Sequence, residues 1–402
     1  MTRNENRSEE PRPQESYNSL RVALLMPVYN EGKTIAATVR EIEEKVLSKM
    51  PNASLFIFED GSKDNTKEVL SFLIDQHRRV FVYMTNDRKG YPRAVREALM
   101  SVDEKAFDYI LFLDSDGQYD PDDFLRIFEV ALNNSVDIVI GQRRKRTEPV
   151  YRIALSSGLR VIEKILFGPP CKDITSALRL IRVDIAKKVA YRVRHSRYSF
   201  WLEFTARATA EGFSMVEVPV NYRARVGEAK SNVYSVRKMP KVVYRELSAI
   251  FHTWWEYRGT QALKFAGVGL SGAAVILGLS YLFTAHLQQN YLLSTTVSIE
   301  ASIIWAFVLN DKLTFAGSKG PRRWYARLGY YNMLSIGGLS MNELILLTLT
   351  VEFRMYYLVA EIVAIVVTFV FNYFTNLKWT WAGVSRPISI PLTKLDTAAH
   401  GT

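Results

Sequence analysis

Short apolar runs alternate with amphipathic stretches along the first 140 residues. Each of five apolar runs predicts a buried strand, at 22–26, 55–58, 80–83, 109–113 and 138–140. Between these runs the apolar residues recur at helical spacing, which predicts helices near 33–49, 64–76, 91–101 and 122–133. Strands that alternate with helices of this length predict an α/β fold with a mostly parallel sheet covered on both faces.

The alternation continues less regularly up to residue 258. We expect a helix at 151–166, a strand at 174–182, a helix at 199–211 and a strand at 215–224. Residues 233–258 then mix aromatic and apolar side chains with Lys and Arg, which is typical of helices that lie in a membrane interface. The alternative for this segment is a packed helix of the α/β domain.

Beyond residue 260 the chain becomes strongly apolar. Four stretches reach the ~20 residues needed to cross a bilayer, at 262–285, 291–310, 329–350 and 356–377. The connection between the second and third stretches, 311–328, is rich in Lys and Arg, which predicts that this loop, the N-terminal domain and the C-terminus are cytoplasmic. The alternative, four core helices of a soluble protein, is disfavoured because apolar runs this long are rare in soluble chains.

These patterns predict a multi-pass protein of the cell membrane with five segments. They are a disordered tail at 1–20, an α/β domain at 21–232, amphipathic interfacial helices at 233–258, a four-span membrane domain at 259–382 and a C-terminal tail at 383–402. The first 20 residues are polar and show no signal-peptide pattern. The single cysteine, Cys171, excludes an internal disulfide and fits a reducing compartment.

Charge adds a constraint on partners. The net charge of +11 and the pI of about 9.5 indicate an anionic partner, and nucleic acid, acidic lipid headgroups and phosphorylated substrates all qualify. The four apolar stretches argue against nucleic acid. Acidic lipid headgroups and phosphorylated substrates remain as partners of a membrane-bound protein.

Polar residues collect where the predicted strands end. Residues 29–31, 59–62, 114–118 and 141–143 each follow a strand, and ligands of open α/β sheets bind outside the carboxyl ends of the strands. The pair Glu59 and Asp60 offers acceptors for base or ribose donors, with a solvated turn as the alternative. Pro27, Tyr29 and Glu31 are expected to shape the first strand-to-helix loop, where helix amides bind phosphates.

The most informative of these strand ends is Asp114-Ser115-Asp116-Gly117-Gln118. Two carboxylates and an amide on a tight loop supply hard oxygen ligands for Mg²⁺ or Mn²⁺. An ion held by few protein groups leaves coordination positions for the phosphates of a nucleoside diphosphate. An isolated Asp-x-Asp would more simply be an acidic turn, but its position after a buried strand favours the metal site.

The motifs at 26–31, 59–66 and 114–118 together resemble those of family 2 glycosyltransferases with the Rossmann-like GT-A fold. Residues 141–143, 173–176 and 225–230, and Arg152 with Ser156, resemble the branch that holds dolichol-phosphate mannosyltransferases and polyprenyl-phosphate glucosyltransferases. The resemblance covers roughly residues 20–240. The C-terminal part is similar to GtrA-like membrane domains through residues 264–269, 300–315 and 372–379.

The resemblance implies roles for individual residues. It assigns the nucleotide sugar to Pro27, Tyr29, Glu31, Glu59, Asp60 and Asp114. It assigns the metal to Asp114, Asp116 and Gln118. It assigns the lipid phosphate to Arg143, Arg152, Ser156, Arg225 and Lys230, and makes Asp116, Arg143 and Arg152 catalytic. Glu59 departs from the family, which more often has aspartate there, and Gly117 and Tyr119 depart from the usual mannosyltransferase motif.

The expected reaction is transfer of a hexose to the phosphate of dolichol or another polyprenyl phosphate at the cytosolic membrane face. Mannose from GDP-mannose is the first choice and glucose from UDP-glucose the alternative, in a metal-dependent, inverting single displacement. A processive polysaccharide synthase is disfavoured because no Gln-x-x-Arg-Trp element occurs at 190–260. A non-enzymatic lipid-sugar translocase is disfavoured because the aspartates and arginines are intact.

Two sets of carboxylates stay open. Glu203 occupies the position of a catalytic base in the wider family, but a phosphate acceptor is already anionic and needs no base. Glu300, Glu343 and Glu361 lie within the apolar stretches, where ionisable groups are costly and are functional candidates. An interhelix hydrogen bond is the alternative for each of them.

Overall fold

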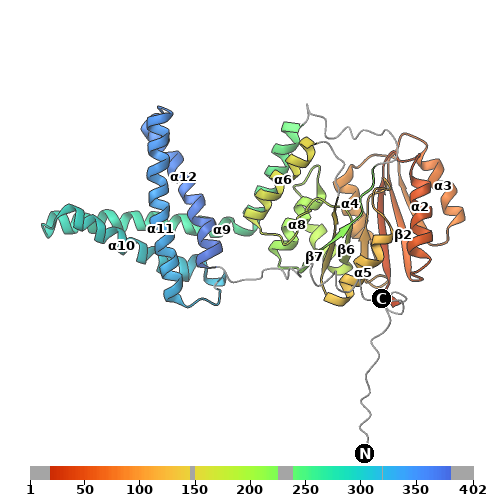
Figure 1. The fold of residues 1–402 in the computed structure, drawn as a ribbon, viewed down its shortest axis with the longest axis horizontal. Coiled ribbons are helices and arrows are strands. Elements are labelled where there is room, and N and C mark those ends of the chain that lie inside the picture. Colours follow the sequence, from red (N-terminus) through yellow and green to blue (C-terminus); the bar gives the residue numbers. More distant parts are fainter. Residues whose placement is uncertain (1–18, 145–149, 225–238, 319, 382–402) are drawn as a thin grey trace, which may run out of the picture. The chain divides into compact units, whose positions relative to one another are not determined.

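The computed structural model describes residues 19–144, 150–224, 239–318 and 320–381 of the chain (Figure 1). The chain divides into two compact units, with the boundary between Trp254 and Trp255. The first unit holds the sheet and the second holds the long apolar helices, as the hydropathy pattern predicts.

The described part of the first unit contains a seven-stranded sheet in the order β3-β2-β1-β4-β6-β5-β7. The strands are β1 (Val22–Val28), β2 (Ala53–Asp60), β3 (Val80–Thr85), β4 (Tyr109–Phe112), β5 (Ile138–Arg143), β6 (Arg179–Arg182) and β7 (Met215–Val220). Only β6 runs antiparallel to its two neighbours, β4 and β5, among the strand pairs described. The prediction of a mostly parallel α/β sheet is confirmed.

Helices flank this sheet (Figure 1). They are α2 (Ile35–Ile42, continued by a π-helical turn at Glu43–Leu47), α3 (Thr66–Gln76), α4 (Tyr91–Ser101), α5 (Asp122–Asn134), α6 (Val150–Leu166), α7 (Val183–Arg192) and α8 (Phe200–Ala210). Strand β1 is buried along its whole length, since it lies inside the sheet and is covered on both faces. Burying one such aliphatic side chain stabilises the fold by about 1.5–3 kcal/mol.

Two local expectations are wrong, and one helix was missed. Strand β1 does not end at Pro27 but continues to Val28, and Pro27 lies in register with Phe58 of β2. The strand expected at 174–182 begins only at Arg179, because residues 173–176 form a turn closed by the Ser176 N–H and the Asp173 carbonyl. Helix α7 was not predicted; its buried face is short and consists of Val and Ile with small alanines.

The four long helices are α9 (Met239–Tyr281), α10 (Tyr291–Leu309), α11 (Trp324–Leu347) and α12 (Tyr357–Thr375). With the π-helical turns that follow them, all four are long and apolar enough to cross a membrane. Large apolar side chains on them are exposed, such as Leu270 and Ile362 at 75% and 62%. The expected four apolar spans are therefore present.

Helix α9 runs without a break from the segment that mixes aromatic residues with Lys and Arg, expected at 233–258, into the first apolar stretch. The boundary expected at 258/259 is therefore not marked by the end of a helix. The other expected boundaries lie next to or within residues outside the described ranges, and so do both expected tails for most of their length. The five-segment division and the interfacial position of 233–258 stay predictions.

Polar contacts join the helices of the second unit. Arg327 of α11 pairs with Asp311, whose carboxylate also accepts a hydrogen bond from the Trp381 indole at 3.0 Å. The Asn332 amide of α11 donates to the Glu300 carboxylate of α10. The alternative of an interhelix hydrogen bond, left open by the sequence, is thus what the structure shows for Glu300.

Candidate functional site

The loops that follow β1 and β2 are hydrogen-bonded to each other at one edge of the sheet. The Glu31 N–H donates to the Thr66 hydroxyl at 2.9 Å, and the Lys63 N–H donates to the Asn30 side-chain oxygen at 2.9 Å. Asn30 has a φ of 56°, a left-handed conformation that Asn tolerates better than most residues. The Glu31 carboxylate is buried and accepts from the Thr34 hydroxyl at 2.8 Å, just before α2.

Glu59 and Asp60 both lie at this edge, and both bind the protein's own backbone. The Ser62 N–H donates to Glu59, and the Lys67 ammonium lies 3.7 Å from the second oxygen of Glu59. The Asp60 carboxylate accepts from the N–H groups of Lys89 and Gly90 at 2.7 and 2.9 Å. In this structure the pair holds two neighbouring loops in place, and its direct contact with a nucleotide stays a prediction.

Tyr29 lies beside the loop that Asp60 holds. The Arg88 guanidinium covers its ring, 3.8 Å from the ring centroid, a cation–π geometry. An aromatic and cationic surface therefore stands at the strand ends, suited to an anionic ligand. Pro27, by contrast, is buried within β1 and lies in the strand rather than in this loop.

Asp114 and Asp116 follow β4 at the same edge and are half-buried. Gly117, with a φ of 69°, makes the turn between them and Gln118. The Tyr91 hydroxyl donates to Asp114 at 3.0 Å, and the Gln118 N–H donates to Asp116 at 3.2 Å. The two carboxylates are the donor type that Mg²⁺ and Mn²⁺ prefer.

The described residues contain no group of three or more His, Cys, Asp or Glu side chains that could hold a metal ion. An ion at Asp114 and Asp116 would therefore complete its coordination with oxygens of a bound ligand. This fits the habit of Mg²⁺, which is held by one or two carboxylates together with substrate phosphates.

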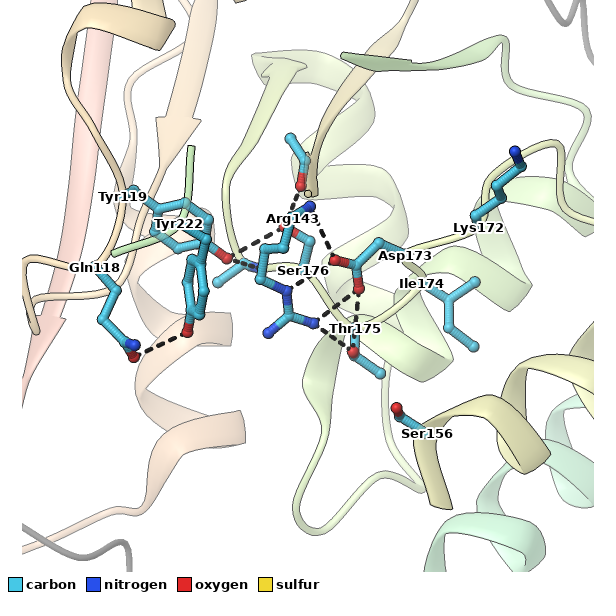
Figure 2. Close-up of polar contacts among 12 residues, drawn as sticks. Gln118, Tyr119, Arg143, Ser156, Lys172, Asp173, Ile174, Thr175, Ser176 and Tyr222 are labelled. Carbon is cyan, nitrogen blue, oxygen red and sulfur yellow. Dashed lines mark hydrogen bonds and ion pairs between the residues drawn. The ribbon is translucent and has the colours of Figure 1, made fainter. Parts of the chain in front are cut away.

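Gln118 is held by the segment that follows β7 (Figure 2). Its side-chain oxygen accepts from the Tyr222 hydroxyl at 2.8 Å, and its amide nitrogen donates to the Arg223 carbonyl at 3.0 Å. An amide oxygen has two lone pairs, so one remains for a metal. The role of Gln118 as a third metal ligand stays a prediction.

Arg143, at the end of β5, forms a two-pronged ion pair with Asp173 (Figure 2). Both hydrogen bonds measure 2.8 Å, and a third reaches the Thr175 hydroxyl at 2.9 Å. Burial opposes the charge on Arg143, but the hydrogen bonds to Asp173 and the charge interactions with Tyr119, Asp173 and Tyr222 together outweigh it and hold the pKa of the guanidinium well above its usual value. Arg143 is therefore a permanent cation in a fixed orientation, partly neutralised by its partner.

Next to this pair, a shallow polar depression lies between α6 and the loop before β6. It is lined by Ser156, Ser157, Arg160, Lys172, Asp173, Ile174 and Thr175. The Arg160 guanidinium donates to the Lys172 carbonyl at 3.4 Å. Two cations and three hydroxyls on one small surface suit a phosphate group.

The sequence reasoning named Ser156 but missed Arg160 and Lys172. Arg160 lies four residues after Ser156, one turn further along the same helix face, and this spacing was the available signal. Arg152 lies in α6, but its side chain is outside the described part of the structure, as are Arg225 and Lys230 entirely.

Glu203 is fully buried and accepts hydrogen bonds from the N–H groups of Arg194, His195 and Ser196. It also pairs with Arg207 at 2.8 Å. These contacts hold the turn before α8 and leave the carboxylate no access to a substrate.

Comparison with known proteins agrees with this geometry. Residues 23–190 match the family described as Glycosyl transferase family 2, and residues 264–381 match the family described as GtrA/DPMS, transmembrane domain. The chain is therefore a membrane protein that joins a family 2 glycosyltransferase domain to a GtrA/DPMS transmembrane domain. The resemblance drawn from the sequence motifs is confirmed, and so is the prediction of a glycosyltransferase.

Two relatives and one solved structure define the similarity further. Dolichol-phosphate mannosyltransferase of Pyrococcus furiosus is 27% identical over 90% of this chain and 100% of its own length. Polyprenol monophosphomannose synthase of Mycolicibacterium smegmatis is 26% identical over 54% of this chain and 83% of its own. Glucosyl-3-phosphoglycerate synthase of Mycobacterium tuberculosis has a TM-score of 0.44 and 13% identity, covering 60% and 82% of the two chains.

Proposed function

We propose that this protein transfers mannose from GDP-mannose to the phosphate of dolichol or another polyprenyl phosphate at the cytoplasmic face of a membrane. The observation that carries the proposal is the position of Asp114 and Asp116 on the sheet edge where β1 and β2 also end, in a chain that continues into four long apolar helices. The names of the two relatives, which are similar to 90% and 54% of this chain, support mannose as the sugar and a lipid phosphate as the acceptor.

On the donor side, Asp114 and Asp116 would hold Mg²⁺ or Mn²⁺ together with the diphosphate. Such an ion neutralises the charge that develops on the departing nucleoside diphosphate. The loops tied by Glu31, Glu59 and Asp60 form the surface on which the nucleoside would lie, and the Arg88–Tyr29 stack offers a cation beside it.

On the acceptor side, the lipid phosphate is already an anion and attacks the sugar without a general base. This fits the engagement of Glu203 by three backbone N–H groups and Arg207. What the site must supply is positive charge and orientation for two anions that repel each other. Arg143 supplies both, and Arg160 and Lys172 extend the positive surface beside Ser156.

The reaction class follows from this division of roles. The lipid phosphate oxygen displaces the nucleoside diphosphate in one in-line step, so an α-linked donor gives a β-linked lipid phosphosugar. Arg152, Arg225 and Lys230 remain proposed contacts of the lipid phosphate on the strength of the family motifs alone.

The test uses the full chain purified in detergent. It is incubated with a short polyprenyl phosphate, Mn²⁺ and labelled GDP-mannose, UDP-glucose or UDP-N-acetylglucosamine, and the lipid product is separated by thin-layer chromatography. We expect lipid-linked mannose from GDP-mannose alone and none in the presence of EDTA. Transfer only from a UDP-sugar would overturn the assignment of GDP-mannose as the donor. Full turnover in EDTA would overturn the requirement for a divalent metal.

A further inference from the structure

Two aromatic residues outside the sequence motifs, Tyr91 and Trp201, are linked to Asp114 by hydrogen bonds. Tyr91, the first residue of α4, donates its hydroxyl hydrogen bond to Asp114 at 3.0 Å. The indole N–H of Trp201, on α8, donates to the Tyr91 hydroxyl oxygen at 3.1 Å. The three side chains are joined by two consecutive hydrogen bonds, from Trp201 to Tyr91 and from Tyr91 to the Asp114 carboxylate.

The donor and acceptor properties of the three groups set the direction of both hydrogen bonds. An indole nitrogen is a donor only, so the Tyr91 oxygen must accept from Trp201, and its own proton is left for Asp114. A carboxylate accepts hydrogen bonds and does not donate them, so Asp114 receives this hydrogen bond from the Tyr91 hydroxyl.

Trp201 is held firmly from its other side. It is 2% exposed, its ring contacts Phe112 of β4 edge-on at 4.8 Å, and the Arg179 guanidinium lies 4.7 Å from its centroid. Arg179 in turn donates to the Ile174 and Ser176 carbonyls at 2.7 and 2.9 Å. The loop that bears Thr175, a partner of Arg143, is thus linked to Trp201.

The backbone just before Tyr91 is bound by Asp60, at the end of β2. Asp60 accepts hydrogen bonds from the backbone N–H groups of Lys89 and Gly90, the two residues that precede Tyr91. Gly90 has a φ of 86°, a backbone conformation that favours glycine, directly before α4 begins. The end of β2 therefore fixes the position from which the Tyr91 ring reaches Asp114.

We propose that Tyr91 and Trp201 are positioning residues that orient the Asp114 carboxylate toward a divalent cation bound with a nucleoside diphosphate. The inference rests on the proposed function only in taking Asp114 as part of the metal–nucleotide site. Hydrogen-bond partners of metal ligands fix the ligand's orientation, and their loss weakens metal affinity or activity by about 10–100-fold.

The test measures Mn²⁺ binding by electron paramagnetic resonance of free Mn²⁺, with the full chain in detergent and saturating GDP. Tyr91→Phe keeps the ring and removes the hydroxyl, and we expect Mn²⁺ to bind about 10-fold more weakly. Trp201→Phe leaves Tyr91 free to rotate its hydroxyl, and we expect a smaller loss. The matched control is Tyr83→Phe, an exposed tyrosine on β3 whose ring stacks on Phe58, with Mn²⁺ binding unchanged.

A merely structural role is distinguished by two further readouts. If Tyr91 only supports the fold, Tyr91→Phe lowers the melting temperature while Mn²⁺ binds with the wild-type constant, and this result overturns the inference. If Tyr91 orients Asp114, the KM for Mn²⁺ rises while the KM for the polyprenyl phosphate stays within about 2-fold.

The outcome also separates this inference from the proposed function. Wild-type protein that binds Mn²⁺ with GDP but transfers no mannose would overturn the proposed reaction and leave the role of Tyr91 decided by the binding data. Wild-type protein that binds no Mn²⁺ in the presence of GDP would overturn the positioning role, because Asp114 would then hold no ion.

Discussion

At the scale of single residues, the carboxylates near the sheet differ in what they bind and in where they stand. Asp60 and Glu203 look catalytic by type, yet both bind backbone N–H groups of neighbouring loops. Asp114 and Asp116 stand at the end of β4, where the Tyr91 hydroxyl and the Gln118 N–H donate to them. Their place at this strand end is why we propose these two carboxylates as the metal ligands.

Asp116→Ala removes one of the two proposed carboxylate ligands. We expect transfer to fall by at least ~100-fold, since loss of a ligand exceeds the loss of a ligand's hydrogen-bond partner. Mannosyl transfer and Mn²⁺ binding are measured together. The control is Asp184→Ala, an exposed aspartate paired with Arg182 at the end of the antiparallel β6 and hence at the other edge of the sheet. Equal activity of the two variants would contradict the assignment of Asp116.

Arg160→Ala tests the positive surface beside Ser156. A hydrogen bond to a charged group contributes about 1.5–3 kcal/mol, so we expect the KM for polyprenyl phosphate to rise by about 10-fold or more with the KM for the donor unchanged. Lys164→Ala is the matched control, because Lys164 is an exposed lysine one turn further along α6 and does not line the depression. A rise only in the KM for the donor would contradict the assignment of Arg160 to the polyprenyl phosphate.

Glu163 provides a prediction of pH dependence. It is fully buried on α6, neither carboxylate oxygen has a hydrogen-bond partner, and burial raises its pKa well above the usual value. The folded state thus holds the Glu163 proton more tightly than the unfolded chain. Its contribution to stability is complete below the unfolded pKa of about 4.3 and is lost as the pH rises through the folded pKa.

Glu163→Gln removes this titration while keeping the shape of the side chain. We expect the wild-type protein to lose thermal stability, relative to the variant, as the pH rises from 4 to 8. Melting temperatures in detergent at several pH values give the comparison. A constant difference across that range would show that Glu163 does not titrate between the folded and unfolded states.

At the scale of elements, the site depends on loops that approach each other closely. Gly61 follows β2 with a φ of 67°, and a Cβ there would lie 2.7 Å from the Arg88 backbone nitrogen. This contact brings the loop before α4, and with it Tyr91, against the strand that bears Asp60. The geometry of one strand end thus sets the position of the next.

Gly61→Ala disturbs that approach. The left-handed conformation costs a non-glycine residue roughly 1–2 kcal/mol, and the backbone contact adds to this. We expect a lower melting temperature and weaker GDP binding, measured by isothermal titration. Gly158→Ala is the opposite control: its Cβ would meet nothing within 4 Å in α6, so we expect it to stabilise the protein by up to about 1 kcal/mol.

The sequence predicted most elements of the catalytic domain because their patterns are local. The apolar runs of β1 to β5 are short and bounded by turn residues, and four of the helices between them appear where the spacing placed them. The first part of the strand expected at 174–182 failed for a tertiary reason: Arg179 donates to the Ile174 and Ser176 carbonyls, so these groups belong to a turn and not to a strand pair.

At the scale of the whole molecule, the distribution of Lys and Arg predicts that the catalytic domain faces the cytoplasm. The described structure contains four helices able to cross a membrane, so the loop between α9 and α10 and the loop between α10 and α11 would emerge on opposite sides. Membrane sidedness is therefore open to a direct labelling test.

The single native cysteine makes that test clean, because Cys171 is buried and gives little background. We expect Gln289→Cys, between α9 and α10, to react with a membrane-impermeant maleimide in intact cells. We expect Ser318→Cys, between α10 and α11, to react only after the membrane is permeabilised. The reverse pattern would place the catalytic domain outside the cytoplasm.

By itself, the sequence determined what depends on neighbours in the chain. Alternation and apolar length predict the strands, helices and membrane stretches, since a sheet and a bilayer each impose a period or a length on the chain that enters them. The Asp114–Gln118 turn marked the proposed metal site in the same way. Only the tertiary structure decided which polar groups are already engaged, because a donor such as Trp201 lies 110 residues from its acceptor Tyr91. Hydrogen bonds across such separations leave no periodic trace in the sequence.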